Sequence, residues 1–252
     1  MRRSMPSNMR LDVYLYENGL AHSRTEAKQL ILDSLVSVNG KVVTKASYDV
    51  DGTAEVSLAD VGVRYVSRGG LKLECAIDNF AFDIDGKMAI DVGASSGGFT
   101  DCLLRHGAAH IIAVDSGTDQ LVQSLREDSR VTVIEGYNAR YMTPSDLPYA
   151  PELAVMDVSF ISATYIMPAL YNCLRDGADF ICLIKPQFEV GRANIGKGGI
   201  VKDDKIRALA VEKVVGFAQS IGFKTEGVVR SSVVGGDGNI EFLAHFKKLV
   251  SP

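Results

Sequence analysis

The chain has no tryptophan, and its 252 residues include four cysteines and four histidines. Cys75, Cys102, Cys173 and Cys182 lie far apart and form no Cys-x-x-Cys pair, so the sequence predicts neither a zinc site nor a disulfide framework. A reducing compartment, the cytoplasm, is the simplest expectation. We expect no metal site.

Long apolar runs are also missing. A membrane-spanning helix needs about 20 predominantly apolar residues, and the most apolar stretches, such as residues 180–184, are cut short by charged residues or proline. The first residues include Arg2 and Arg3, and no signal-peptide apolar core follows them. We therefore expect no role in a membrane.

Positive charge is not in excess over the whole chain, because 27 Lys and Arg stand against 31 Asp and Glu. This net charge of −4 argues against a protein that coats nucleic acid without specificity. Residues 1–45 differ, since seven Lys and Arg face four Asp and Glu there, an excess of three. Contacts with nucleic acid are expected to begin in this segment.

The N-terminal segment predicts two short helices followed by a hairpin. Apolar residues over 11–15 indicate a helix that Gly19 ends. Ser23 is predicted to cap a second helix, with Glu26 completing a capping box. Valines alternate on both sides of the Asn-Gly pair at residues 39–40, a pair that favours a tight β-hairpin turn.

Four cations lie at or near these predicted helix starts and the turn: Arg10, Arg24, Lys28 and Lys41. One surface facing phosphates is geometrically possible for them, and they are our candidate RNA contacts in this segment. The alternative is that they are solvated charges on a structural module.

The stretch RLDVYLYENGLAHSRTEAKQLI, followed by VSVNGKVV, resembles the alpha-L RNA-binding domain, the type named after ribosomal protein S-four. The resemblance covers roughly residues 9–58, and its Ser-Arg helix start and V-N-G-K turn occur in order. It implies binding to structured RNA.

The rest of the chain alternates strand-like and helix-like segments, which is typical of an α/β fold with a parallel sheet. Seven strands are expected, at residues 88–92, 110–114, 131–134, 153–156, 180–184, 224–229 and 240–246. The predicted fold class is α/β, a Rossmann-like domain with a seven-stranded mixed sheet at residues 63–252. A small α+β domain is expected at residues 1–62.

The first of these strands runs into a glycine-rich turn, DVGASSGGFT, which begins at Asp91. Such a turn lets a ligand lie against bare backbone at the carboxyl end of the sheet. Its spacing is not G-x-G-x-x-G, so a dinucleotide is less favoured. Asp115 ends the second strand, where a carboxylate can accept hydrogen bonds from both ribose hydroxyls of a nucleoside. A tight structural turn with a surface aspartate is the alternative.

An acid and a lysine follow two later strands. Asp157 ends the fourth strand and Lys185 ends the fifth, so both lie where open α/β sheets bind ligands. A lysine that follows an apolar strand is expected to be desolvated, which favours loss of its proton. A salt bridge between the two is the alternative.

Five segments resemble the TlyA family, sometimes labelled hemolysins, whose catalytic domain is similar to FtsJ-type ribose methyltransferases. They are SRGGLKLE from Ser67, DVGASSGGFTD from Asp91, DVSFIS from Asp157, LIKPQFE from Leu183 and GNIEFL from Gly238. The resemblance implies a class I methyltransferase fold, S-adenosylmethionine as cofactor, and ribosomal RNA or ribosomal subunits as partners.

The resemblance also implies site residues. A Lys-Asp-Lys-Glu tetrad that methylates a ribose 2'-hydroxyl falls on Lys72, Asp157, Lys185 and Glu241, and Arg68 is a further candidate RNA contact. The candidate cofactor residues are Asp91, Gly93, Ala94, Ser95, Gly97, Gly98, Phe99, Asp115 and Asp157.

Each tetrad member has an expected role. Lys185 would meet the hydroxyl as a neutral base or an oriented hydrogen-bond partner, with Lys72 as a second cation that helps lower its proton affinity. Asp157 and Glu241 would hold the two amines in place. The chain departs from the family pattern after Asp115, where SGTDQ replaces a Gly-Tyr-Gly-Gln-like run, and at Ser231-Ser232, where Ser-Pro is common.

Three other functions compete with this interpretation. An RNA-binding or ribosome-assembly factor that transfers nothing is opposed by the intact tetrad. A membrane-active hemolysin lacks support, because the sequence shows no span and no basic amphipathic helix. A base-modifying methyltransferase is a nearer rival, but no N-P-P-Y type motif follows the fourth strand.

Overall fold

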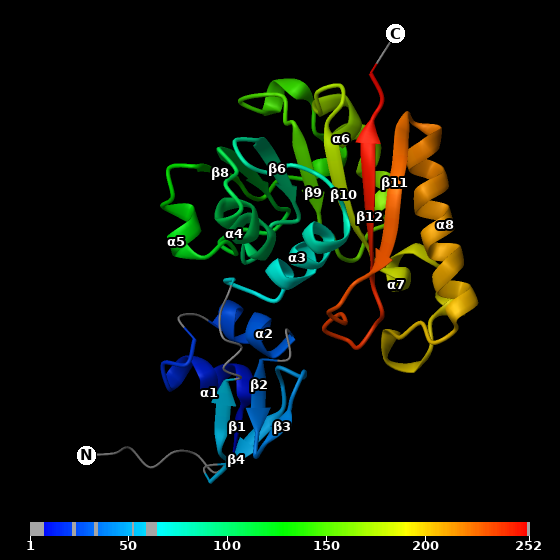
Figure 1. Ribbon diagram of the computed structural model, residues 1–252. Coiled ribbons are helices and arrows are strands. Elements are labelled where there is room, and N and C mark those ends of the chain that lie inside the picture. The colour runs from blue at the N-terminus through cyan, green and yellow to red at the C-terminus, as the bar shows by residue number, and fades with distance from the viewer. Residues whose placement is uncertain (1–7, 22–23, 33–34, 52, 59–64, 251–252) are drawn as a thin grey trace. The chain divides into compact units, whose positions relative to one another are not determined.

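The computed structural model describes residues 8–21, 24–32, 35–51, 53–58 and 65–250 (Figure 1). The chain divides into two compact units, Met1–Arg64 and Tyr65–Pro252. Among the described residues, no helix has both the length and the apolar character that crossing a bilayer requires.

The first unit contains the two helices and the hairpin predicted from the sequence. Its elements are β1 (Asn8–Arg10), α1 (Leu11–Glu17), α2 (Arg24–Leu32), β2 (Val36–Val38), β3 (Lys41–Val42), β4 (Asp49–Asp51) and β5 (Val56–Leu58). Asn39 and Gly40 have φ angles of 51° and 74°, as the tight turn between β2 and β3 requires. The predicted cap, Ser23, lies outside the described residues.

The first unit also has strands that the sequence pattern did not indicate. β5 pairs antiparallel with β2, and β1 pairs antiparallel with β4. Leu11 and Leu15 of α1, Ile31 of α2, and Val36 and Val38 of β2 are all buried in one shared core. Burial of these side chains holds the short elements together, since strands of two or three residues are not stable alone.

The second unit is built on one seven-stranded sheet. Its strands are β6 (Met88–Val92), β7 (His110–Val114), β8 (Val131–Ile134), β9 (Leu153–Met156), β10 (Asp179–Ile184), β11 (Phe223–Arg230) and β12 (Phe242–Lys248). They lie in the order β11-β12-β10-β9-β6-β7-β8. The five strands β6 to β10 are parallel to one another, whereas β12 is antiparallel to both β10 and β11. The predicted mixed α/β sheet is confirmed.

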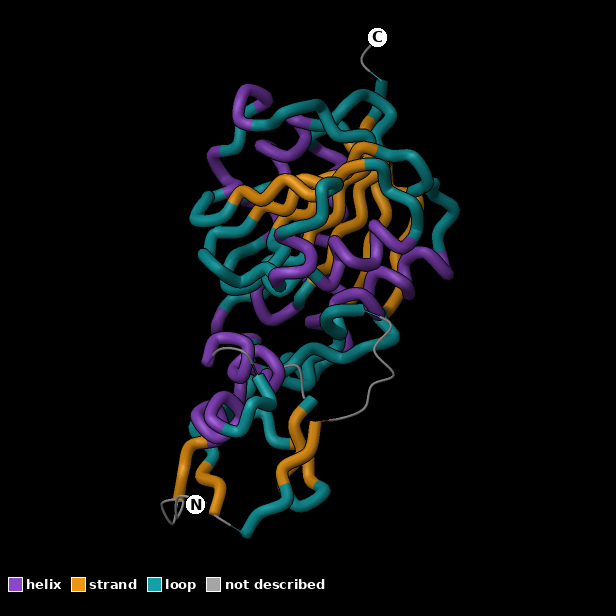
Figure 2. Tube along the Cα trace, turned by 90° about the vertical axis from the view of Figure 1, so that its left-hand side faces the viewer, coloured by secondary structure: helices purple, strands orange, loops and turns teal. Residues whose placement is uncertain are grey.

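Helices connect these strands (Figures 1 and 2). They are α3 (Gly69–Asn79), α4 (Gly98–Arg105), α5 (Gln123–Arg126), α6 (Met167–Cys173), α7 (Pro186–Glu189) and α8 (Asp204–Ser220). Short 3-10 turns lie at Ala139–Tyr141, Pro144–Asp146, Ala163–Tyr165, Arg192–Asn194 and Lys197–Gly199.

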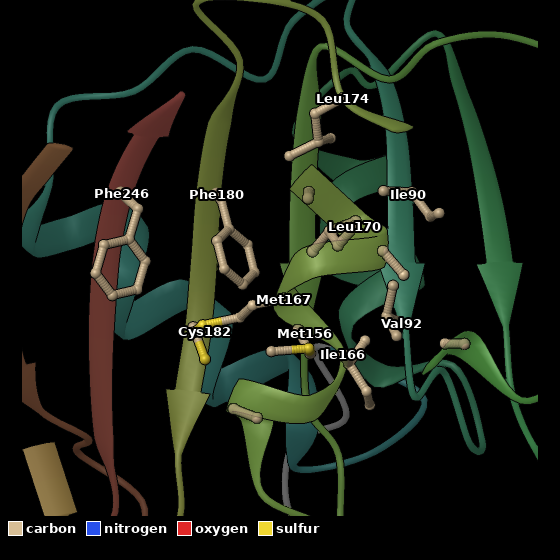
Figure 3. Close-up of a cluster of buried hydrophobic side chains, with 14 of the residues drawn as sticks. Ile90, Val92, Met156, Ile166, Met167, Leu170, Leu174, Phe180, Cys182 and Phe246 are labelled. Atoms are coloured by element: carbon tan, nitrogen blue, oxygen red, sulfur yellow. The ribbon is translucent and has the colours of Figure 1, made fainter. Parts of the chain in front are cut away.

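Alternate residues of the strands face two separate cores. Ile90, Met156 and Cys182 pack with Leu170 of α6 (Figure 3). Val214 of α8 belongs to the same core. Ala89, Val155 and Ile181, each one residue earlier in its strand, pack in the other core with Leu73 of α3 and Leu103 of α4. Because both faces are covered, the central strands read as continuous apolar runs, which is why they were predictable.

The last strand is the one whose predicted position is wrong by two residues. It was expected at 240–246 and extends over Phe242–Lys248. The residues before Phe242 pair with the preceding loop instead of the sheet: the amide of Gly235 donates to the carbonyl of Asn239, and the amide of Ser231 donates to that of Glu241.

Candidate active site

The glycine-rich turn after β6 is shaped mainly by contacts within the protein. Gly93 has φ of 87°, and a Cβ there would overlap the carbonyl oxygen of Asp157. A Cβ at Gly98 would overlap the Ser67 hydroxyl and crowd the Gly70 amide. The glycines therefore let the turn pack tightly against the loop after β9 and the start of α3.

Asp91, the acidic residue of β6, is fully buried. Its Oδ2 accepts a hydrogen bond of 2.7 Å from the Thr100 hydroxyl, while its Oδ1 is buried without a hydrogen-bond partner among the described residues. Burial raises the pKa of Asp91 to about 7, the charges of Asp157 and Asp115 add to this, and the Thr100 hydrogen bond opposes it. An unpartnered acceptor beside the turn is suited to a donor from a bound ligand.

Asp115 follows β7 and lies across the turn. Its Oδ2 accepts from the Ser95 amide at 2.8 Å, and its Oδ1 accepts from the Gly117 amide at 2.7 Å. A carboxylate has about four lone-pair sites, so two remain for ligand hydroxyls. The side chains of Ala94 and Phe99, in contrast, are buried in the core with α3 and α4, and the Ala94 amide donates to the Val114 carbonyl.

The four predicted tetrad residues lie together, although they come from α3 and from the ends of three strands. Lys185 Nζ is 2.5 Å from Asp157 Oδ1, and Lys72 Nζ is 4.0 Å from Asp157 Oδ2. Lys72 Nζ is also 2.7 Å from Glu241 Oε2. Acids and amines therefore alternate through a chain of ion pairs in the order Glu241, Lys72, Asp157 and Lys185.

The tetrad is largely shielded from solvent. The side chains are 10% (Lys72), 11% (Lys185), 19% (Asp157) and 2% (Glu241) exposed. Burial opposes the charge of Lys72, but Asp157 and Glu241 raise its pKa above the ordinary value. Burial likewise opposes the charge of Asp157, but Lys185 and Lys72 hold its pKa below the ordinary value. Lys72 and Asp157 are thus charged at neutral pH.

Two residues beside the tetrad were not predicted. Lys185 Nζ donates a hydrogen bond of 2.8 Å to the Ser159 hydroxyl, which is exposed. Phe160 has φ of 64° and is 92% exposed, and its ring centre is 5.2 Å from that of Phe188. A phenylalanine is usually expected in a core, so its sequence position gave no signal of this exposure.

A buried hydrogen-bond network fixes the loop that carries Asp157 and Ser159. Glu189 of α7 accepts from the Ser162 hydroxyl at 2.5 Å and from the Ala163 amide at 2.8 Å. Lys213 of α8 neutralises it at 3.0 Å. The loop after β9 is thereby tied to the helix that follows Lys185.

The predicted RNA contacts have different environments. Arg10 and Arg24 both pair with Asp12, at 2.9 and 3.0 Å, and the Asp12 side chain is fully buried. Burial opposes the charge of Asp12, but the two arginines hold its pKa below the ordinary value. Lys28 and Lys41 are exposed. Arg10 and Arg24 therefore have a structural role whether or not they contact RNA.

Arg68 lies in the second unit, next to the tetrad. It precedes α3, and its buried Nε makes no hydrogen bond with a described residue. Its positive charge acts to lower the pKa of Lys72, four residues later, against the stronger opposite effect of the two acids. A cation in this position favours an anionic ligand close to the tetrad.

A separate polar cluster lies between α3 and α4. Glu74, Cys102 and His106 each offer one atom of a type that binds metal ions, and these three atoms lie within 4.8 Å of one another. The Tyr65 hydroxyl donates to Glu74, and the nearer ring nitrogen of His106 lies 2.9 Å from the Cys102 carbonyl oxygen. The spacing of the cysteines did not predict this cluster, because Glu74 comes from another helix.

Family models match both units of the chain. A model described as FtsJ-like methyltransferase matches residues 65–248, and one described as S4 domain matches residues 9–56. A protein from Mycobacterium tuberculosis named 16S/23S rRNA (cytidine-2'-O)-methyltransferase TlyA is 43% identical over 239 residues, which are 94% of this chain and 89% of that protein. The chain belongs to the TlyA family of FtsJ-like methyltransferases.

Two further proteins are similar to this chain over most of its length. YqxC of Bacillus subtilis is 46% identical over 237 residues, which are 94% of this chain and 84% of that protein. A solved structure from Streptococcus thermophilus, named as a hemolysin, has a TM-score of 0.77 and 46% identity and covers 99% of this chain and 91% of that one. The chain is thus a methyltransferase with an S4 domain, and S-adenosylmethionine is its methyl donor.

Proposed function

We propose that the protein is a cytoplasmic enzyme that transfers a methyl group from S-adenosylmethionine to a ribose 2'-hydroxyl of ribosomal RNA. The chain of ion pairs from Glu241 through Lys72 and Asp157 to Lys185 carries this proposal. It is supported by relatives named as rRNA (cytidine-2'-O)-methyltransferases and by the S4 domain.

The proposed cofactor residues fit the chemistry of S-adenosylmethionine. The free lone pairs of Asp115 accept hydrogen bonds from the ribose hydroxyls, as acids at this strand end do in related folds. The unpartnered Oδ1 of Asp91 accepts from a donor of the amino acid portion. The backbone of residues 93–99 lines the site between them. When bound, the cofactor supplies an electrophilic methyl group.

The proposed catalytic role of the tetrad is to align the ribose hydroxyl and to accept its proton on the Lys185 amine, after that amine has released one proton of its own to solvent. Lys185 is held from two sides, by Asp157 and by the Ser159 hydroxyl, so its amine has a fixed direction. Lys72 keeps its charge and holds Asp157 and Glu241 in place. A positioned acid or base typically contributes about 10² to 10⁴-fold, and alignment of the reactants can contribute more.

A factor that binds RNA without transferring a methyl group remains the alternative. A purely structural site has no need of two lysines and two acids in one shielded cluster, because such clusters are costly to bury. Incubation with methyl-labelled cofactor and each purified ribosomal subunit tests the proposal: RNA of at least one subunit should become labelled. Absence of label from both would contradict methylation of ribosomal RNA.

Replacing Asp115 with alanine should weaken cofactor binding markedly. The variant loses the acceptor for the ribose hydroxyls and frees the amides of Ser95 and Gly117, which shape the turn. Titration calorimetry with S-adenosylmethionine measures the change, and Asp128→Ala, which breaks the ion pair with Arg130 elsewhere in the same unit, is the control. Equal affinity in the Asp115 variant and the control would remove Asp115 from the cofactor site.

Replacing Lys28 and Lys41 together with glutamine should weaken RNA binding and flatten its salt dependence. Both are exposed, and unlike Arg10 and Arg24 they do not neutralise Asp12, so folding is preserved. Each lost phosphate contact makes the negative slope of log affinity against log salt shallower by about 0.9 on a duplex and 0.7 on single strands. Filter binding at several salt concentrations measures it, and an unchanged slope would identify these lysines as solvated surface charges.

A further inference from the structure

The loop that follows α7, residues 191–202, carries positive charge and no negative charge. Its sequence is GRANIGKGGIVK, and no acidic residue lies between Glu189 and Asp203. Arg192, Lys197 and Lys202 are exposed, and none of them forms an ion pair within the described part of the chain. Two later cations are different, since Arg207 pairs with Asp204 and Lys213 with Glu189, whereas Lys205, which precedes both, is exposed and forms no ion pair with a described residue.

The base of this basic loop is firmly anchored. Asn239, which is 1% exposed, accepts a hydrogen bond of 2.9 Å from the Val201 amide and donates one of 3.0 Å to the Gly199 carbonyl. The Gly196 amide donates to the Ile200 carbonyl at 2.9 Å, which closes the tip on itself. The cations are therefore presented on a fixed backbone.

The anchor places the basic loop beside the catalytic tetrad. Asn239 is two residues before Glu241, and the loop begins shortly after Lys185, on the far side of α7. A Cβ on Gly235 would lie 2.6 Å from Glu241 Oε1, so the 231–241 loop folds tightly around its own tetrad residue, Glu241. Figure 1 shows the 231–241 loop and the basic loop at the same end of the strands of the sheet, where α7 lies.

We propose that residues 191–202 form a phosphate-binding site for the RNA substrate, in which Arg192, Lys197 and Lys202 contact backbone phosphates next to the target ribose. The inference rests on the proposed function, which brings a ribose to Lys185. A nucleotide at that position has charged phosphates on both sides, and unpaired cations gain by replacing the counterions of those phosphates. No ion pair has to be broken first.

The test is the double variant Lys197→Gln/Lys202→Gln. Its control is Lys87→Gln/Lys224→Gln, which removes the same charge at the opposite end of the strands, where β6 and β11 begin and where Lys224 pairs with Glu226. Filter binding measures the affinity of each protein, at several salt concentrations, for the ribosomal subunit that serves as its substrate. The negative slope of log affinity against log salt should become shallower by about 1.4 to 1.8 in the loop variant. It should remain at the wild-type value in the control.

Two further measurements separate this inference from the proposed function. Cofactor affinity and the rate of methyl transfer at saturating RNA should stay within threefold of wild type in the loop variant, while KM for the subunit rises. If wild-type protein labels no RNA, the proposed function fails. If wild type labels RNA but the loop variant keeps the wild-type slope, or the control loses as much, the phosphate site is overturned.

Discussion

Replacing Lys185 with methionine is expected to lower the rate of methyl transfer about 100-fold or more, while cofactor affinity stays nearly the same. The variant keeps the length of the side chain but loses the amine that meets the ribose hydroxyl. Lys185 itself is not among the candidate cofactor residues, and its contacts are with Asp157 and Ser159, so binding and chemistry should separate. Single-turnover transfer and calorimetry on one preparation measure both.

The competing explanation for Lys185 is a structural one. If Lys185 served only to neutralise Asp157, its loss would leave a shielded carboxylate unpaired and would destabilise the fold by about 3 to 5 kcal/mol. Activity would then fall in proportion to the unfolded fraction. A Lys185→Met protein that melts early but methylates at the wild-type rate per folded molecule would contradict the catalytic role.

Replacing Lys72 with methionine is expected to have the largest effect on stability. Glu241 is 2% exposed and lies 2.7 Å from Lys72, so the variant retains a buried carboxylate without its cation. Removing one partner of a buried ion pair costs about 3 to 5 kcal/mol. Urea unfolding should show this loss through a lower transition midpoint.

The double variant Lys72→Met/Glu241→Gln makes this prediction specific. With the carboxylate neutralised, most of the lost stability should return, because no unpaired charge remains buried. Methyl transfer should not return, since the cation that orders Asp157 is still absent. A double variant as unstable as Lys72→Met alone would show that the ion pair does not account for the loss.

The main sheet could be predicted from the sequence, but the small strands of the first unit could not. β6, β7 and β9 are buried on both faces and therefore appear as apolar runs. β1 and β4 have three residues each, with polar residues on both sides of a single valine or methionine, so no periodicity marks them. β12 begins later than expected because the carbonyls of Asn239 and Glu241 accept hydrogen bonds from the preceding loop instead of from the sheet.

The site was predicted in its members but not in its connections. Resemblance to a family supplied Lys72, Asp157, Lys185 and Glu241, and the distances among them required the fold. The pairing of Arg10 and Arg24 with Asp12 was not foreseen, because an aspartate is expected on the surface unless it is paired. Phe160 and Asn239 gave no signal, since their exposure and burial are opposite to what their side chains suggest.

The chemical position of the transferred label shows whether the methyl group is attached to a ribose hydroxyl of ribosomal RNA. Labelled ribosomal RNA is digested to nucleosides, which are separated and identified by mass spectrometry. We expect the label to elute as a 2'-O-methylnucleoside, and we expect alkali to leave the RNA uncleaved on the 3' side of that nucleotide. Label found on a nucleobase, with alkali cleaving normally at that nucleotide, would contradict attachment to the ribose.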